Sequence, residues 1–126
     1  MDRHKVLIVD DEMEFAETLA ERLNLRNFEA RAVGGAEEAQ TMIGAGWRPD
    51  VVLLDLKMPG MDGLATLDMI KAMDQAIEVI MLTGHGSTAS GIIGMQRGLF
   101  DYLMKPVDIG DLVEKINQAA AKQKTG

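Results

Sequence analysis

The chain has 126 residues, the length of one domain, and its 47% hydrophobic and 26% charged residues are ordinary for a globular protein. A net charge of -7 disfavours direct contact with nucleic acid or an anionic membrane, and no apolar run reaches the roughly 18 residues of a membrane span. The sequence has no cysteine, which rules out a disulfide framework and permits a reducing compartment, so we expect a cytoplasmic protein that acts on another protein.

The N-terminal part of the chain predicts a strand, a helix, a strand and a helix. The apolar run 6–9 predicts a strand buried on both faces. Apolar residues four apart, with acids between them, then predict an amphipathic helix over residues 12–26. A weaker strand is predicted over residues 29–33 and a short helix over residues 36–43, where glycines stop it.

The rest of the chain continues this alternation, beginning with the apolar run 51–55, which ends at a carboxylate. Four consecutive apolar residues between two Pro-containing turns predict a central strand that delivers Asp55 at its carboxyl end. The later elements are predicted as a helix over residues 64–73, a strand over 78–83, a helix over 88–97, a strand over 101–104 and a helix through 112–120, followed by a polar tail from Lys122.

Two residue types inside these elements carry further expectations. Gly91 and Gly94 lie within the predicted helix 88–97, where they either leave the helix mobile or permit close packing by a neighbour. Four of the methionines fall at core-like positions and are predicted to fill gaps in the core: Met69, Met73, Met81 and Met104.

Strands that alternate with helices in this way predict an α/β fold with a parallel sheet, because parallel neighbours need long crossover connections. Right-handed crossovers place helices on both faces of such a sheet. The carboxyl ends of the strands then share one edge, so the polar residues that end the strands are predicted to cluster. No repeat, linker or second domain is evident, and we expect one domain over residues 1–126.

The predicted cluster contains Asp10, Asp11 and Asp55, with Thr83 and Lys105 beside them. Three carboxylates this close repel one another unless a cation intervenes, and hard oxygen ligands favour Mg²⁺. The Lys105 ammonium and the Thr83 hydroxyl both suit phosphoryl oxygens. A carboxylate with such neighbours has what a phosphoryl-accepting nucleophile needs.

At these residues the chain resembles a bacterial two-component response-regulator receiver domain of the chemotaxis-regulator type. The matching stretches follow the family's order and cover nearly the whole chain: residues 9–12, 54–63, 82–84 and 101–106. The resemblance implies a flavodoxin-like, doubly wound sheet of five parallel strands in the order 2-1-3-4-5. It also implies a phosphorelay protein, not an enzyme in its own right, that takes a phosphoryl group from a sensor histidine kinase.

The resemblance assigns the site residues as follows. Asp55 is the modified phosphoacceptor, the metal ligands are Asp10, Asp11, Asp55 and the backbone carbonyl of Lys57, and Mn²⁺ substitutes for Mg²⁺. Thr83 and Tyr102 are the switch pair, Lys105 senses the phosphoryl group, and Lys57 and His85 lie at the pocket mouth. A cis bond before Pro106 is typical of the family, although sequence alone gives it a small prior.

The implied output is a change of the surface around the fourth helix, the fifth strand and the fifth helix. The changed surface would act on a downstream protein target or on an output domain missing from this chain, and phosphorylation would favour a homodimer. Direct contact with nucleic acid or membrane is not expected of this chain.

Three other functions fit parts of this sequence pattern. A haloacid-dehalogenase-type phosphatase needs a second Asp two residues beyond the nucleophile, where this chain has Lys57. A nucleotide-binding flavodoxin-like protein needs phosphate-cradling glycines after the first strand, where this chain has acids. A phosphorylation-independent interaction module is disfavoured by the complete set of pocket residues, and incubation with a small phosphodonor and Mg²⁺ decides against or for it.

Overall fold

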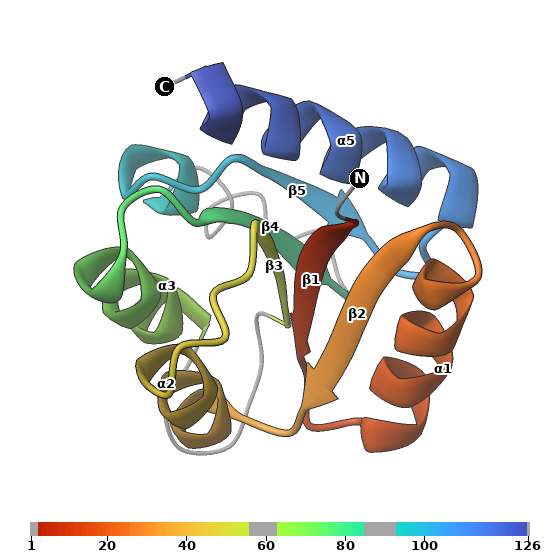
Figure 1. Cartoon of the computed structure of the whole chain (residues 1–126), viewed down its shortest axis with the longest axis horizontal. Helices are drawn as coiled ribbons and strands as arrows, with labels where there is room; N and C mark the ends of the chain where they lie inside the picture. The colour runs from red at the N-terminus through yellow and green to blue at the C-terminus, as the bar shows by residue number, and fades with distance from the viewer. Residues whose placement is uncertain (1–2, 56–62, 85–92, 126) are drawn as a thin grey trace.

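The computed structural model describes residues 3–55, 63–84 and 93–125, and strands alternate with helices through these ranges (Figure 1). The strands are β1 (His4–Val9), β2 (Phe28–Val33), β3 (Val51–Asp55), β4 (Glu78–Thr83) and β5 (Asp101–Met104). The helices are α1 (Met13–Asn24), α2 (Ala36–Gly44), α3 (Gly63–Met73) and α5 (Ile109–Thr125), and residues 93–96 are also helical.

The strands form one parallel sheet in the order β2-β1-β3-β4-β5, which confirms the predicted topology. α1 and α5 lie on one side of the sheet and α2 and α3 on the other, as Figure 1 shows. β1 begins two residues before its apolar run, because His4 already pairs with Phe28 of β2.

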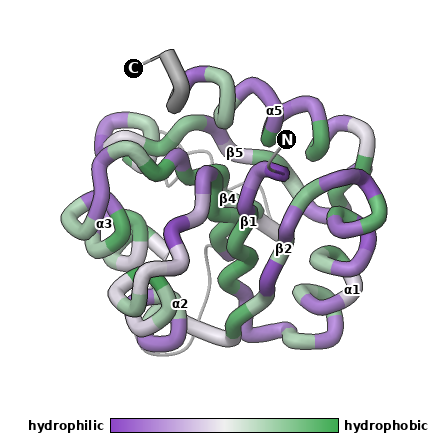
Figure 2. The backbone as a smooth tube through the Cα atoms, in the orientation of Figure 1, coloured by the Kyte–Doolittle hydropathy of each residue, from purple (hydrophilic) through white to green (hydrophobic). Residues whose placement is uncertain are grey.

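The sheet separates two apolar clusters, and the strands supply alternate residues to each. In Figure 2 the central strands are largely green, the colour of hydrophobic residues. The cluster under α1 and α5 takes Val51 and Leu53 from β3, whereas the cluster under α2 and α3 takes Val52 and Leu54. All five residues of β3 are buried, as predicted for a central strand. Asp55 therefore ends a strand that is buried along its whole length.

The prediction of a polar tail from Lys122 was wrong, because α5 continues to Thr125. The residues that follow Ala121 are Lys, Gln and Lys, which are good helix formers, and no Gly or Pro interrupts them before Gly126. In the described parts of the chain, no helix combines the length and the apolar character that crossing a membrane requires.

The predicted core position of Met104 was also wrong, because its side chain is 55% exposed. Met104 is the last residue of β5, an edge strand that pairs only with β4, so less of its surroundings is filled by protein. Met81 in β4 is 1% exposed, and Met69 and Met73 are partly buried against the α2 and α3 cluster.

Gly98 ends the helical segment 93–96 with a φ of 100°, a left-handed conformation that favours glycine at a helix end. The Leu99 N–H donates to the Gly94 carbonyl at 2.9 Å, and Leu99 is buried. A Cβ at Gly94 would stand 2.9 Å from Leu99 Cδ2 and 3.5 Å from Leu99 Cβ. Close packing is therefore the reason for Gly94, while Gly91 lies outside the described residues.

We expect Gly94→Ala to destabilise the protein by about 1–3 kcal/mol, because the added methyl overpacks Leu99. Urea unfolding measures the change, and Gly94→Ala/Leu99→Ala should cost less than the two single changes together. Stabilisation by about 1 kcal/mol, as relief of a mobile helix predicts, would contradict the packing explanation.

Candidate functional site

The register of the central strands brings Asp10 and Asp55 side by side. Val9 of β1 pairs with Leu54 of β3, so Asp10 and Asp55 are the next residues along the two chains. Asp10 is held beyond the end of β1 by its N–H, which donates to the Val33 carbonyl at 3.1 Å. Both aspartates are buried, at 1% and 7% exposed respectively. Two carboxylates therefore lie inside the carboxyl edge of the sheet.

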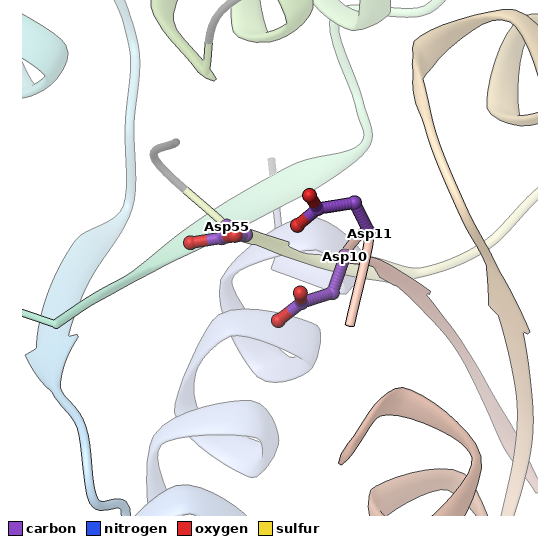
Figure 3. Close-up of side chains that lie close together, drawn as sticks. All are labelled: Asp10, Asp11 and Asp55. Carbon is purple, nitrogen blue, oxygen red and sulfur yellow. The ribbon is translucent and has the colours of Figure 1, made fainter. Parts of the chain in front are cut away.

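Asp11 joins this pair from the solvent side. Figure 3 shows the three aspartates gathered at the ends of β1 and β3, and one carboxylate oxygen from each lies within 4.8 Å of the others. Oxygen ligands on opposite sides of Mg²⁺ are about 4.2 Å apart, since each bond is about 2.1 Å. The donor type and the span of the three groups therefore fit Mg²⁺ after small rotations of the side chains.

Lys105 reaches the same cluster from β5. Its N–H donates to the Thr83 carbonyl at 2.7 Å, which ties the ends of β4 and β5 together, and the bond to Pro106 is cis. Its Nζ donates to Asp10 Oδ2 at 2.9 Å and lies 3.7 Å from Asp55 Oδ1. The structure thus brings together the three predicted ligand carboxylates and the predicted lysine.

The charge state of Lys105 follows from these contacts. Burial lowers the pKa of Lys105, but the hydrogen bond to Asp10 and the charges of Asp10, Asp55 and Glu12 outweigh burial and raise the pKa above its usual 10.5. Lys105 is therefore an ammonium ion at neutral pH. It neutralises part of the acidic cluster in the metal-free protein.

Sequence reasoning assigned no role to two residues that contact Lys105. Glu12 Oε1 lies 3.6 Å from Lys105 Nζ, and the Glu12 N–H donates to Asp10 Oδ1 at 2.9 Å where α1 begins. The Phe15 ring centroid lies 4.5 Å from the same Nζ. Glu12 and Phe15 follow Asp11 by one and four residues, and this short spacing is the feature of the sequence that could have placed them near the site.

Thr83 and Tyr102 lie on the neighbouring strands β4 and β5. Thr83 ends β4 and is 5% exposed, and Tyr102 of β5 is partly buried against the α2 and α3 cluster. Tyr102 pairs with Met81, and strand alternation assigns Met81 and Thr83 to the same face. Strand alternation therefore assigns the predicted switch pair to the α2 and α3 side of the sheet and Asp55 to the α1 and α5 side.

The remaining predicted site residues, Lys57 and His85, lie outside the described residues. The metal contact through the Lys57 carbonyl and the role of both residues at the pocket mouth stay predictions.

A buried carboxylate beside an ammonium and a cluster of carboxylates that could hold a metal ion suits acceptance of a phosphoryl group. Such transfer depends mainly on positioning and on neutralising the charge of the phosphoryl oxygens. Asp55 supplies an oxygen nucleophile, Lys105 a positive charge, and the aspartate cluster a place for a second one.

Comparison with known proteins identifies the family of this chain. A family model described as the response regulator receiver domain matches residues 6–117. The DNA-binding response regulator MtrA of Mycolicibacterium paratuberculosis is 35% identical over 114 residues, which are 90% of this chain and 50% of the relative. The transcriptional regulatory protein PrrA of Mycobacterium tuberculosis is 35% identical over 89% of this chain and 48% of its own length. The chain thus spans about half the length of these relatives.

Solved structures give the same result over nearly complete chains. A response regulator receiver domain protein from Clostridium thermocellum is 33% identical with a TM-score of 0.91, covering 97% of this chain and 98% of the other. The receiver domain of NtrX from Brucella abortus is 31% identical with a TM-score of 0.86, covering 92% and 98%. The chain belongs to the response regulator receiver domain family of two-component signalling.

Proposed function

We propose that Asp55 accepts a phosphoryl group from the phosphohistidine of a sensor histidine kinase, in a reaction that requires Mg²⁺. The observation that carries this proposal is the single cluster in which Asp10, Asp11 and Asp55 offer oxygens within 4.8 Å of one another and Lys105 Nζ lies 3.7 Å from Asp55. This arrangement couples a nucleophile to two sources of positive charge.

In the transfer, a bond forms between an Asp55 carboxylate oxygen and phosphorus while the bond from phosphorus to the kinase imidazole nitrogen breaks. The electron pair of the broken bond stays on the imidazole. Lys105 neutralises charge on the phosphoryl oxygens and must exchange its contact with Asp10 or Asp55 for one with them. Mg²⁺, or Mn²⁺ in its place, supplies further positive charge when held by Asp10, Asp11, Asp55 and the Lys57 carbonyl.

Hydrolysis of the acyl phosphate returns the domain to its resting state, so the chemistry is that of a signalling domain that turns over its own modification. We propose that Lys57 and His85 influence this step by screening or positioning the attacking water. Alanine variants of each should change the decay of the phosphorylated form more than its formation. Unchanged decay in both variants would leave them as surface residues.

We propose that the switch runs through Thr83 and Tyr102 to the fourth helix, β5 and α5. The Lys105 N–H donates a backbone hydrogen bond to the Thr83 carbonyl, which links the two residues. Met95 and Met104 are 47% and 55% exposed, so apolar side chains are accessible on two parts of this surface. Phosphorylation needs to supply only the free-energy difference between the resting and the switched arrangement of this surface.

The partners follow from this scheme. The donor is a sensor histidine kinase, and the output is a downstream protein target or an output domain outside this chain, with homodimer formation on phosphorylation. Residues 1–126 form a single receiver domain, and the negative charge of this domain makes direct nucleic-acid contact by it unfavourable. A protein that works with cytoplasmic kinase domains is itself cytoplasmic.

Incubation with acetyl phosphate tests the proposal without the kinase. We expect wild type to gain the mass of one phosphoryl group with Mg²⁺ and none after chelation, as read by intact-mass spectrometry. Asp55→Asn should gain nothing, whereas Asp68→Asn should behave as wild type, because Asp68 is an exposed residue paired with Arg97 on the surface. Undiminished, acid-stable modification of Asp55→Asn would place the phosphoryl group on another residue and overturn the proposal. The absence of any modification in wild type would also overturn it and would favour a phosphorylation-independent interaction module.

A further inference from the structure

Lys105 has a partner that carries no charge. Three carboxylates surround its ammonium, at 2.9 Å for Asp10, 3.6 Å for Glu12 and 3.7 Å for Asp55, and the ring centroid of Phe15 lies 4.5 Å away. This distance is within the range of a cation–π contact, in which the negative face of a ring attracts the cation. The neutral ring holds the ammonium without cancelling its charge.

Two of the three carboxylate partners would be engaged by ligands during the proposed reaction. Asp10 and Asp55 would bind the metal, and Asp55 would also carry the phosphoryl group. Glu12 is 70% exposed, so its ion pair with Lys105 is screened by solvent and holds the ammonium weakly. The Phe15 ring has no oxygen atom to bind a metal or a phosphoryl group, so neither ligand competes with Lys105 for it.

Phe15 is itself fixed in position. It lies in the first turn of α1, three residues after Glu12, and it packs against the cluster under α1 and α5. It also lines a groove of about 650 Å³ between α1 and the chain after β5, to which Val107 and Ile109 contribute. The Phe15 ring therefore borders both the groove and the Lys105 ammonium.

We propose that Phe15 is a positioning residue for Lys105, whose ring keeps the ammonium directed over the pocket so that it meets the phosphoryl oxygens on Asp55. The proposal rests on the proposed phosphoacceptor function and adds a residue to it. Phe15 acts through Lys105 and does not touch the reacting atoms. A purely structural Phe15 would instead serve only to fill the core beside Val107 and Ile109.

Ring electronics separate these two roles. Phe15→Leu removes the ring, a trifluorinated phenylalanine keeps its shape but weakens the negative face, and Phe15→Tyr keeps both. Phe100→Leu is the matched control, because Phe100 packs against the same cluster with Lys122 Nζ 5.6 Å from its ring, at the opposite end of β5. Thermal unfolding of each variant shows which ones remain folded.

The first readout needs neither metal nor phosphoryl group. In metal-free wild type, the Lys105 methylene protons next to Nζ should show the upfield NMR shift of protons above an aromatic ring. Phe15→Leu should lose this shift and Phe15→Tyr retain it. Signals that are the same in wild type and Phe15→Leu would overturn the proposal.

The second readout is the affinity for beryllofluoride, a phosphoryl mimic, at saturating Mg²⁺. We expect a loss of roughly two- to fivefold for Phe15→Leu and for the trifluorinated ring, the size of one cation–π contact, with recovery in Phe15→Tyr and no change in Phe100→Leu. Equal affinity of wild type and the trifluorinated protein would overturn the proposal. Failure of wild type to bind beryllofluoride at all would count against the phosphoacceptor function, and the metal-free NMR comparison would still decide the role of Phe15.

Discussion

Replacing Lys105 with alanine lowers the rate of phosphoryl uptake by roughly 10²–10³-fold, the usual cost of losing one group that stabilises transition-state charge. The same variant binds Mg²⁺ more tightly than wild type. Its ammonium contacts Asp10 at 2.9 Å and Asp55 at 3.7 Å, so in the empty pocket it competes with the metal for the same oxygens. The two effects have opposite signs because Lys105 opposes the metal in the resting state and acts with it during transfer.

Acetyl phosphate uptake and Mg²⁺ titration of one Lys105→Ala preparation measure both effects. Lys115→Ala is the control, because Lys115 pairs with Asp101 at 2.7 Å on α5, away from the acidic cluster. Slow uptake together with weaker Mg²⁺ binding would show that the substitution disturbs the pocket as a whole. Phosphoryl uptake by Lys105→Ala at the wild-type rate would show that Lys105 has no role in the transfer.

We expect Mg²⁺ to stabilise the wild-type fold by about 2.7 kcal/mol at a hundredfold excess over its Kd, and Asp10→Asn to lose about half of this gain or more at the same Mg²⁺ concentration. Asp10 is 1% exposed and contributes one of the three clustered carboxylates. Affinity for a hard cation depends on the number of ligand charges, so we expect the Kd to rise by about tenfold or more. The amide oxygen still accepts the Glu12 N–H bond that starts α1, which keeps the local backbone in place.

Thermal unfolding with and without Mg²⁺ measures this effect in wild type, Asp10→Asn and Asp68→Asn. The exposed Asp68 lies outside the cluster, so its variant should gain as much stability from Mg²⁺ as wild type. An equal response of Asp10→Asn and wild type would place the metal at other ligands.

The sequence predicts most of the architecture because each buried strand is a short apolar run that ends at a polar residue. In a parallel sheet such ends share one edge, which is why Asp10, Asp55 and Lys105 could be grouped without coordinates. The register of β1 against β3 then fixes how close the aspartates lie, and this pairing follows from tertiary packing. The local sequence of either strand does not specify this register.

The features that were missed depend on contacts between distant parts of the chain. Phe15 follows the apolar pattern of the amphipathic helix predicted over residues 12–26, and that pattern does not reveal that its ring also contacts a lysine 90 positions later. Met104 was placed in the core because the pattern of a strand does not reveal that the strand lies at an edge. Gly94 could be mobile or packed until the position of Leu99 was known.

Locating the phosphoryl group within the chain tests the central claim most directly. Borohydride reduces an aspartyl phosphate to homoserine, and peptide mapping identifies the residue that was modified. After incubation of wild type with acetyl phosphate and Mg²⁺, we predict homoserine at position 55 and unmodified aspartate at positions 10 and 11. Homoserine at position 10 or 11, or at no position in a protein that has gained phosphoryl mass, would contradict the assignment of Asp55 as the acceptor.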